Sequence, residues 1–267
     1  MTANEDRTRR VAVVMASPAS GRTLLGLLAP LFASGGRYEV HGVFLEDADA
    51  SHAASLPFVK EVCRVTFSVR EFTSDQFERN VALNVRTARR AFSLLAAQTG
   101  LPHSFRNVRG SGGRMVGEAA AEADVTVFEP VQLRLSSLVR AVPGRQPQRR
   151  IVALLGDRES APEILDTALR LAAGDSREVT VLLAPPDGVD TAELRDLVQE
   201  MLPRKPASLR YLKGEEFTAL CVAARELGAT LAVVSAGRVL ERPDSLQRIR
   251  SGMPCPVCLV RSDTPTD

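Results

Sequence analysis

The chain alternates short aliphatic runs with longer stretches in which apolar residues recur at helical spacing. Residues 11–15 (VAVVM) and 38–45 are the first two aliphatic runs, and residues 24–32 between them carry apolar side chains every three or four positions. Short aliphatic runs predict buried strands, whereas a three-to-four spacing predicts an amphipathic helix. The first 45 residues therefore predict a strand–helix–strand unit.

The same succession returns in the second half of the chain. Residues 151–155 (IVALL) predict a strand, residues 161–173 a helix, and residues 178–184 a second strand. Ser160 and Glu163 have the spacing of a capping box at the start of that helix. The chain therefore contains an internal repeat.

The repeat continues beyond the second strand of each unit. Residues 105–110 (FRNVRG) and 209–214 (LRYLKG) both end in a basic residue and glycine. Each leads into a predicted Ala-rich helix and then a fourth strand, and a short helix follows at Ser136 and at Asp244. The predicted helices span 114–123 and 216–227, and the predicted fourth strands span 125–128 and 231–234.

Extra residues in the first unit, 46–100, separate its second and third strands. A helix is expected over residues 75–99, with Thr73 and Gln76 as a capping box and Gly100 as its terminator. Residues 55–59 (SLPFV) suggest an apolar lid or contact surface. The acidic residues that open this insertion, 46–49, are a conceivable cation site, although a solvated loop is the plainer interpretation.

The two units differ at their ends. The second unit closes with a predicted fifth strand over residues 257–260, whereas the first has a Pro-, Gly- and Gln-containing linker over residues 141–148. A missing fifth strand leaves an uncovered sheet edge. We expect the two units, or two copies of the chain, to pack against each other at these edges.

This alternation defines the fold class. Strands joined by helical crossovers form parallel sheets. We therefore expect an α/β protein of two tandem doubly wound parallel-sheet domains, over residues 9–142 and 149–262, with the helical insertion over 46–100 in the first.

Composition and charge narrow the function classes. A net charge of +2, from 34 basic and 32 acidic residues, gives no reason to expect a nucleic acid as partner. No apolar run is long enough to span a bilayer, and no secretory signal is recognisable, so the chain is expected to be cytoplasmic and not membrane-embedded. The four cysteines do not form a disulfide framework in a chain of 267 residues; they are Cys63, Cys221, Cys255 and Cys258.

In this order, the segments resemble the universal stress protein family. Residues 151–173 (IVALLGDRESAPEILDTALRLAA), 229–237 (ATLAVVSAG) and 254–261 (PCPVCLVR) resemble it most, and residues 42–62 are similar to the tandem bacterial members. The resemblance implies a strand order of 3-2-1-4-5, dimer-like pairing of domains and a role in stress physiology.

Nucleotide-binding members of this family have an Asp after the first strand. After the fourth strand they have a G-x-x-G loop and then a G-S or G-T step. The corresponding positions in the second unit are Gly156, Asp157, Ser235, Gly237 and Ser245. Glycines let backbone amides approach phosphate, and a helix N-terminus favours negative charge.

This chain departs from that nucleotide pattern in both units. Ala16 replaces the first Asp, Gly156 and Asp157 reverse the expected order, and Glu129 with Pro130 replaces a loop glycine. Asp244 at a helix start would cap the amides and repel phosphate. We therefore expect degenerate nucleotide loops and no cofactor, with ATP possible but disfavoured.

Other patterns have plainer interpretations beside functional ones. Gly110, Ser111, Gly112 and Gly113 could cradle an anion, or could simply form a strand-to-helix turn. Cys255 and Cys258 have redox spacing, but buried structural thiols are favoured because Cys258 lies inside an apolar strand. The Arg-rich segment 134–150 could contact an acidic partner or a membrane surface, or could be a solvated linker, which its Pro and Gln residues favour.

No catalytic constellation emerges from the sequence: His41, His52 and His103 are scattered without triad or metal spacing. We expect a non-catalytic stress-response protein, not an enzyme, that acts through an unidentified protein partner, with homodimer or intramolecular domain pairing. The alternative is a sensor of ATP, AMP or another small ligand. A hydrolase or nucleotide-dependent ligase is the third class.

Overall fold

The structure is a computed structural model of the chain. It describes residues 7–56, 59–62, 66–71, 73–131, 149–184, 191–202, 206 and 208–262. The expected helix at Ser136, the linker 141–148, Cys63, and Arg134, Arg140 and Arg145 of the Arg-rich segment lie outside these residues. So does part of the apolar segment 55–59.

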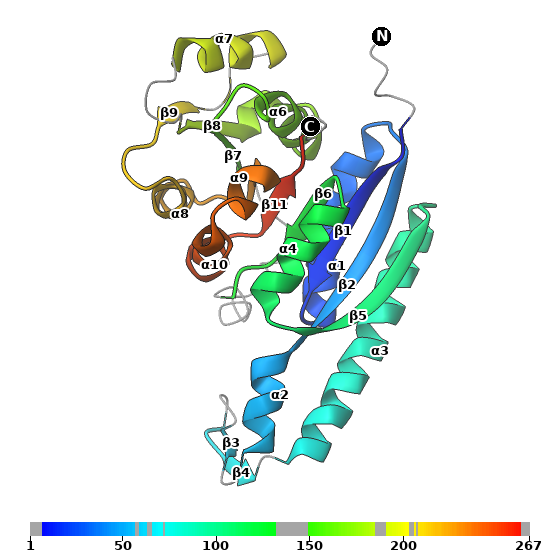
Figure 1. Cartoon of the computed structure of the whole chain (residues 1–267). Coiled ribbons are helices and arrows are strands. Elements are labelled where there is room, and N and C mark those ends of the chain that lie inside the picture. The colour runs from blue at the N-terminus through cyan, green and yellow to red at the C-terminus, as the bar shows by residue number, and fades with distance from the viewer. Residues whose placement is uncertain are drawn as a thin grey trace.

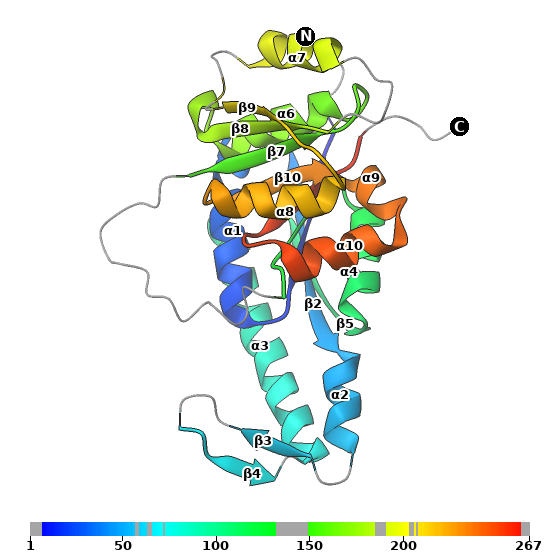
Figure 2. The same cartoon turned by 90° about the vertical axis from the view of Figure 1, so that its left-hand side faces the viewer.

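The first unit follows the predicted succession of strands and helices. It contains β1 (Arg9–Met15), α1 (Pro18–Ala33), β2 (Tyr38–Asp47), β5 (His103–Gly110), α4 (Gly112–Glu122) and β6 (Val125–Phe128). The insertion forms α2 (Ala48–Ser55), the short antiparallel strands β3 (Lys60–Val62) and β4 (Val69–Glu71), and the long helix α3 (Ser74–Gln98). Helix α2, β3, β4 and the beginning of α3 project from the rest of the molecule (Figures 1 and 2), whereas the remainder of α3 packs on it.

The second unit repeats this succession and adds a fifth strand. Its elements are β7 (Ile151–Leu155), α6 (Ala161–Leu171), the 3-10 turn η1 (Ser176–Glu178), β8 (Val179–Leu183), α7 (Thr191–Met201), β9 (Ser208–Tyr211), α8 (Glu216–Glu226), β10 (Leu231–Ser235), α9 (Ala236–Leu240), α10 (Pro243–Gly252) and β11 (Val257–Val260). Helix α7 was not predicted; it takes the place that α3 takes in the first unit, between the second and third strands.

All nine long strands form one sheet in the order β5-β2-β1-β6-β11-β10-β7-β8-β9. Within each unit the order is 3-2-1-4, and β11 adds the fifth place in the second unit. Every neighbouring pair is parallel except β6 and β11, which are antiparallel. The expected pairing of the two units at the edge without a fifth strand is confirmed within a single chain.

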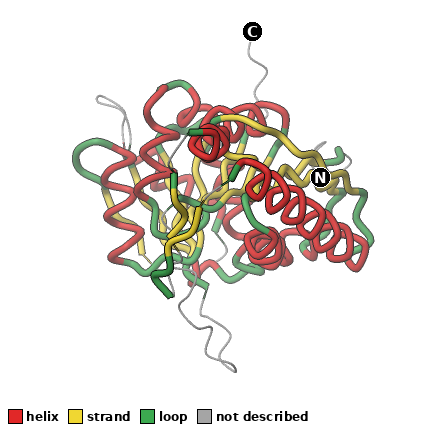
Figure 3. The backbone as a smooth tube through the Cα atoms, turned by 90° about the horizontal axis from the view of Figure 1, so that it is seen from below, coloured by secondary structure: helices red, strands yellow, loops and turns green. Residues whose placement is uncertain are grey.

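This shared sheet also merges the apolar interiors of the two units. On one face, α1, α3, α6 and α7 cover a cluster that includes Leu28, Val127, Ile164 and Val181. On the other face, α4, α8, α9 and α10 cover a cluster that includes Val116 and Leu220. Helices accordingly lie on both sides of the strands (Figure 3). The duplication is visible in the topology, but the apolar core on each face runs through both units.

One buried carboxylate ties three strands together where the units meet. Asp124 is 4% exposed and lies directly before β6. Its Oδ2 accepts a hydrogen bond from the backbone N–H of Arg10 at 2.7 Å, and its Oδ1 accepts from Arg7 at 2.9 Å and from Arg261 at 3.0 Å. The backbone N–H of Arg261 also donates to the Asp124 carbonyl. This carboxylate therefore joins the beginnings of β1 and β6 to the end of β11.

The ends of two helices test the capping predictions. Thr73 caps α3 by accepting a hydrogen bond from the N–H of Gln76, and Gly100 follows the helix with a φ of +69° that favours glycine. The capping box predicted for Ser160 is wrong. Ser160 makes no side-chain cap, because its N–H and Oγ both donate to Asp157 Oδ1 at 2.7 Å.

None of the helices that the structure describes is long and apolar enough to cross a membrane.

Asp124→Ala tests the junction between the units. We expect the substitution to lower the free energy of unfolding by about 1–3 kcal/mol, because the backbone N–H of Arg10 loses its acceptor and the partly exposed Arg7 and Arg261 lose their shared carboxylate. Chemical denaturation measures this change. Glu118→Ala is the control, because Glu118 pairs with Arg114 on the surface and its loss should cost less than about 0.5 kcal/mol. Equal effects of the two substitutions would contradict the role of Asp124.

Candidate functional site

A cavity of about 680 Å³ lies at the carboxyl end of the second unit's strands. This is the edge at which doubly wound sheets bind ligands. Because β6 and β11 are antiparallel, this edge meets the amino end of the first unit, which contributes Arg7 and Ala120 to the lining. The second unit contributes Asp157, Ser160, Ser235, Gly237, Arg238 and Glu241.

The guanidinium of Arg238 occupies the inner wall of this cavity. Arg238 lies in the single-turn helix α9, directly after β10, and its side chain is 17% exposed. It donates to both carboxylate oxygens of Glu216, at 3.0 Å and 2.6 Å, and to Asp157 Oδ2 at 3.4 Å. The carbonyl of Ala184, which follows β8, accepts another contact at 3.5 Å. One cation thus bridges the ends of β7, β8 and β10.

The carboxylates around Arg238 complete a largely self-neutralising group. Glu216, at the start of α8, is only 8% exposed at its side chain. Burial lowers the pKa of Arg238, but hydrogen bonds to Glu216 and the charges of Glu216 and Asp157 outweigh it and raise the pKa overall. A buried charge persists when it is paired and hydrogen-bonded in this way. Arg238 therefore stays cationic and fixed in the crevice.

Gly156 permits this arrangement by its lack of a side chain. A Cβ atom on Gly156 would lie 2.1 Å from Cζ of Arg238. No side chain can occupy that space while the guanidinium is present. Gly156, a position of the nucleotide loop in the resembling family, lies against an arginine in this chain.

The structure brings together most of the residues predicted for nucleotide binding. Asp157, Ser235 and Gly237 line the cavity, and Gly156 lies beneath Arg238. Ser235 caps α9 by accepting from the N–H of Arg238 at 3.4 Å. Ser245 is not among the lining residues and is buried within α10. Whether these residues hold a nucleotide stays a prediction.

Asp244 does not cap α10, contrary to the sequence-based expectation. The N-cap of α10 is Arg242, which makes no side-chain hydrogen bond to the first turn, and Asp244 lies inside that turn. The residue still brings a negative charge to the helix N-terminus, where the backbone dipole favours it.

In the first unit, the glycine-rich loop meets another arginine. Ser111 caps α4, and a Cβ on Gly112 would lie 2.1 Å from Nη2 of Arg250 in α10. Gly113 is also close to Arg250, and Gly110 packs near Met115. These glycines therefore permit close contact between α4 and the second unit. An anion at this loop stays a prediction, with Arg250 as the nearest cation.

Glu46 is the one member of the acidic segment whose side chain the structure describes. It accepts from Arg109 Nε at 3.0 Å and from the amide of Asn107. Its charge is therefore already balanced by Arg109. Within the described residues, no three His, Cys, Asp or Glu side chains come together as ligands for a metal ion.

Cys255 and Cys258 are buried on opposite faces of the sheet. Cys255 belongs to the apolar cluster under α8 and α10, whereas Cys258 belongs to the cluster under α1 and α6. A separation of three residues in an extended segment places side chains on opposite faces. Burial raises the pKa of both thiols to about 12. The arrangement fits structural thiols and does not fit a redox pair.

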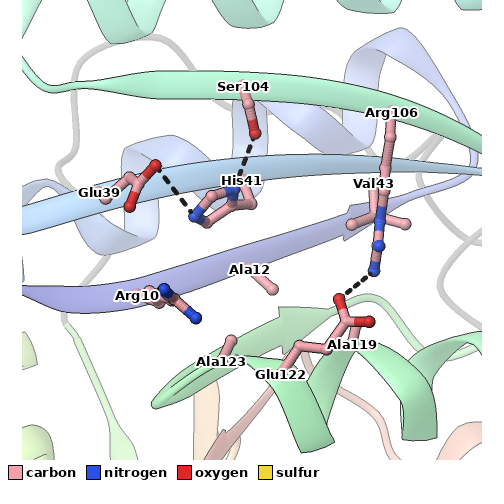
Figure 4. Close-up of a pocket in the computed structure, with 10 residues that line it drawn as sticks. All are labelled: Arg10, Ala12, Glu39, His41, Val43, Ser104, Arg106, Ala119, Glu122 and Ala123. Carbon is pink, nitrogen blue, oxygen red and sulfur yellow. Dashed lines mark hydrogen bonds and ion pairs between the residues drawn. The ribbon is translucent and has the colours of Figure 1, made fainter.

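A smaller cavity, of about 290 Å³, lies at the amino end of the first unit (Figure 4). Small side chains, Ala12, Ala119 and Ala123, leave the space. Nδ1 of His41 lies 2.7 Å from Oγ of Ser104 on the neighbouring strand, and Nε2 lies 3.5 Å from Glu39. Across the cavity, Arg106 pairs with Glu122 at 2.7 Å.

The sequence analysis predicted neither the position of Arg238 nor the contact between His41 and Ser104. Arg238 stands three residues after Ser235, where the resembling G-x-x-G loop has its second glycine, so an arginine there was a signal that the loop had changed. The pair of His41 and Ser104 could not be found in the same way, because it depends on the register between β2 and β5.

Comparison with solved structures places this arrangement among known folds. A universal stress protein from Archaeoglobus fulgidus DSM 4304 matches with a TM-score of 0.50 and 12% identity, over 96% of this chain and 99% of that one. The chain has a tandem universal stress protein fold. A functionally unknown protein from Pseudomonas aeruginosa PAO1 matches less well, with a TM-score of 0.45 and 12% identity over 96% of this chain and 93% of that one. Another such match is the cytoplasmic domain of a prokaryotic cation chloride cotransporter (TM-score 0.42, 13% identity, 95% and 96%).

The sequence comparisons add no further relatives of this universal stress protein fold. No family model matches the chain, and no curated protein matches it.

Arg238→Ala tests the charge group in the crevice. We expect a loss of about 3 kcal/mol in the free energy of unfolding, because buried Glu216 loses its two hydrogen bonds to Arg238 and keeps a contact of 3.8 Å with the exposed Arg242. Arg238→Ala combined with Glu216→Gln should recover much of that loss. Urea denaturation of the two variants measures both changes. A double variant no more stable than Arg238→Ala alone would contradict the pairing.

Thiol labelling tests the environment of the C-terminal cysteines. In a Cys63→Ser background, we expect Cys255 and Cys258 to resist a disulfide reagent at about pH 8, since a pKa of about 12 leaves about one thiolate in ten thousand. Labelling should become complete on unfolding. Rapid modification of both thiols in the folded protein would contradict their burial.

Proposed function

We propose that this chain is a non-catalytic stress-response protein of the cytoplasm that acts through protein partners. The proposal is carried by the occupation of the second unit's crevice by Arg238 and its two carboxylate partners. In a universal stress protein fold, that crevice is the expected place for a nucleotide. Here it is lined by charges that already satisfy one another.

The electrostatics of the crevice support this interpretation. A phosphate approaching Gly156 would meet the Arg238 guanidinium, but also the carboxylates of Glu216 and Asp157 that hold it. Binding would require the anion to compete with these carboxylates, one of which is buried. Releasing a buried carboxylate from its arginine costs several kcal/mol. The charge group therefore disfavours nucleotide binding without excluding other roles for the surface.

Nucleotide titration tests the proposal. We expect ATP, ADP and AMP at millimolar concentration to leave the melting temperature of the purified protein unchanged, and no nucleotide to co-purify with it. A ligand at a hundred times its Kd would add about 2.7 kcal/mol of stability, so binding would be evident. A dose-dependent stabilisation would overturn the proposal, and turnover of the nucleotide would indicate an enzyme.

A second candidate function is sensing of a small polar ligand in the cavity of Figure 4. Two groups favour it. Nε2 of His41 is buried without a hydrogen bond, at an ion-pair distance of 3.5 Å from Glu39, and within the described part of the chain the Arg10 guanidinium makes no hydrogen bond or ion pair. A ligand oxygen could accept from both. The same thermal measurement, repeated with acetate and inorganic phosphate, separates the two functions. A stabilisation lost in Arg10→Ala but kept in the Arg238→Ala, Glu216→Gln variant would favour this cavity.

A further inference from the structure

The solvent side of α3 carries a row of arginines and leucines. Arg79, Leu83, Arg86, Arg90 and Leu94 recur every three or four residues, so their side chains lie along one side of the helix. We call these five residues the basic stripe. The opposite side of α3 packs on the protein through its buried residues, which are Ala88, Phe92 and Ala96.

The two leucines of the basic stripe are unusually open to solvent. Leu83 is 62% exposed and Leu94 is 58% exposed. Helix α3 lies at the margin of the molecule beside the edge strand β5 (Figure 1). Removing apolar side chains from water favours association, so these leucines offer apolar contact area to another molecule.

The charge of the stripe is of one sign. Between Arg79 and the end of α3 at Gln98 the sequence has no Asp or Glu. Arg79, Arg86 and Arg90 are exposed, and within the described residues their guanidiniums have no hydrogen bond or ion pair. Neighbouring arginines differ: Arg89 lies 5.3 Å from the centre of the Phe105 ring, and Arg109 pairs with Glu78 and Glu46.

This charge argues against a second copy of the chain as the occupant. A two-fold symmetric contact would place the basic stripe against itself. The arginines of one copy would then face those of the other, and like charges across an interface oppose association. The complementary surface must carry carboxylates.

We propose that the basic stripe binds an amphipathic acidic helix of another protein. Leu83 and Leu94 are 11 residues apart (94 − 83), or about 16 Å along the helix axis. The partner helix would present apolar residues at a similar separation, with Asp or Glu between them facing Arg86 and Arg90. This inference rests on the proposed function, since it specifies the chemistry of the protein partner.

A designed peptide tests the basic stripe directly. The probe is a fluorescent helical peptide of about 20 residues with leucines 11 apart and two glutamates between them; its binding to the full chain is followed by fluorescence anisotropy. We expect saturable binding that weakens as salt is raised. Arg86→Glu with Arg90→Glu should weaken it at least tenfold. A peptide with lysines in place of the two glutamates should restore binding to that variant.

Two further variants separate this effect from general changes in charge or packing. Arg210→Glu with Lys213→Glu makes the same change in net charge at exposed positions of the second unit, and should bind the acidic peptide as the unsubstituted chain does. Leu83→Ser with Leu94→Ser should weaken binding while leaving the fold intact, as circular dichroism would verify. Rescue by the lysine peptide shows that the charge-reversed variant is folded.

Three results would overturn the inference. The acidic peptide could bind no more tightly than its lysine counterpart. The protein could bind phosphatidylserine vesicles but not the peptide, which would indicate a membrane surface. Sedimentation could show a dimer that Arg86→Glu with Arg90→Glu abolishes. Nucleotide binding would contradict the proposed function without altering the peptide result, so the two failures are distinguishable.

Discussion

The antiparallel pairing of β6 with β11 is the contact on which the whole architecture depends. All eight paired residues, 125–128 and 257–260, are at most 1% exposed, so the junction lies at the centre of the sheet and not at its rim. One fifth strand serves both units, parallel to β10 and antiparallel to β6. Because parallel strands share one carboxyl edge, this reversal places the carboxyl edges of the two units on opposite edges of the shared sheet.

The same reversal explains why the larger cavity draws residues from both units. The amino end of the first unit brings Arg7 and the end of α4 beside the carboxyl end of the second. Within the second unit alone, Arg238 fills the place where the strand ends diverge, and Glu216 and Asp157 hold it there. A rigid cation with two fixed carboxylates is a structural element of this crevice. The surfaces that we propose for recognition lie elsewhere, on the cavity of the first unit and on the insertion.

Much of the fold could be predicted because the relevant signals are local. The aliphatic runs of β1, β7 and β11, the Thr73 cap and Gly100 after α3 are properties of short segments, and the uncovered edge of the first unit followed from comparing the two halves. The partner of the uncovered edge could not be predicted, because no local signal distinguishes pairing of the two units within one chain from pairing between two chains. Helix α7 was missed because its counterpart α3 is more than twice as long and was taken as part of an insertion.

The candidate sites were less accessible to sequence reasoning than the fold. Gly156, Asp157, Ser235 and Gly237 were placed together correctly as neighbours, because the carboxyl ends of parallel strands converge. Their partner Arg238, in the single-turn helix α9, was overlooked, although an arginine three residues after Ser235 was a signal that the loop had changed. Ser160 was predicted to cap the backbone N–H groups at the start of α6, but its hydroxyl donates to Asp157 instead. Serine side chains can bond to nearby polar groups in several ways, so the sequence did not decide between these two partners. The contact of His41 with Ser104 depends on strand register, which a single sequence does not specify.

The shared strand also has a consequence for biosynthesis. Phe128 and its partner Val257 are 129 positions apart (257 − 128), so the first unit leaves the ribosome long before its central edge can be covered. Strand edges that stay open during translation are vulnerable to mispairing with nascent chains nearby. The newly made first unit must therefore wait, as a partly assembled intermediate, for the whole second unit to follow it.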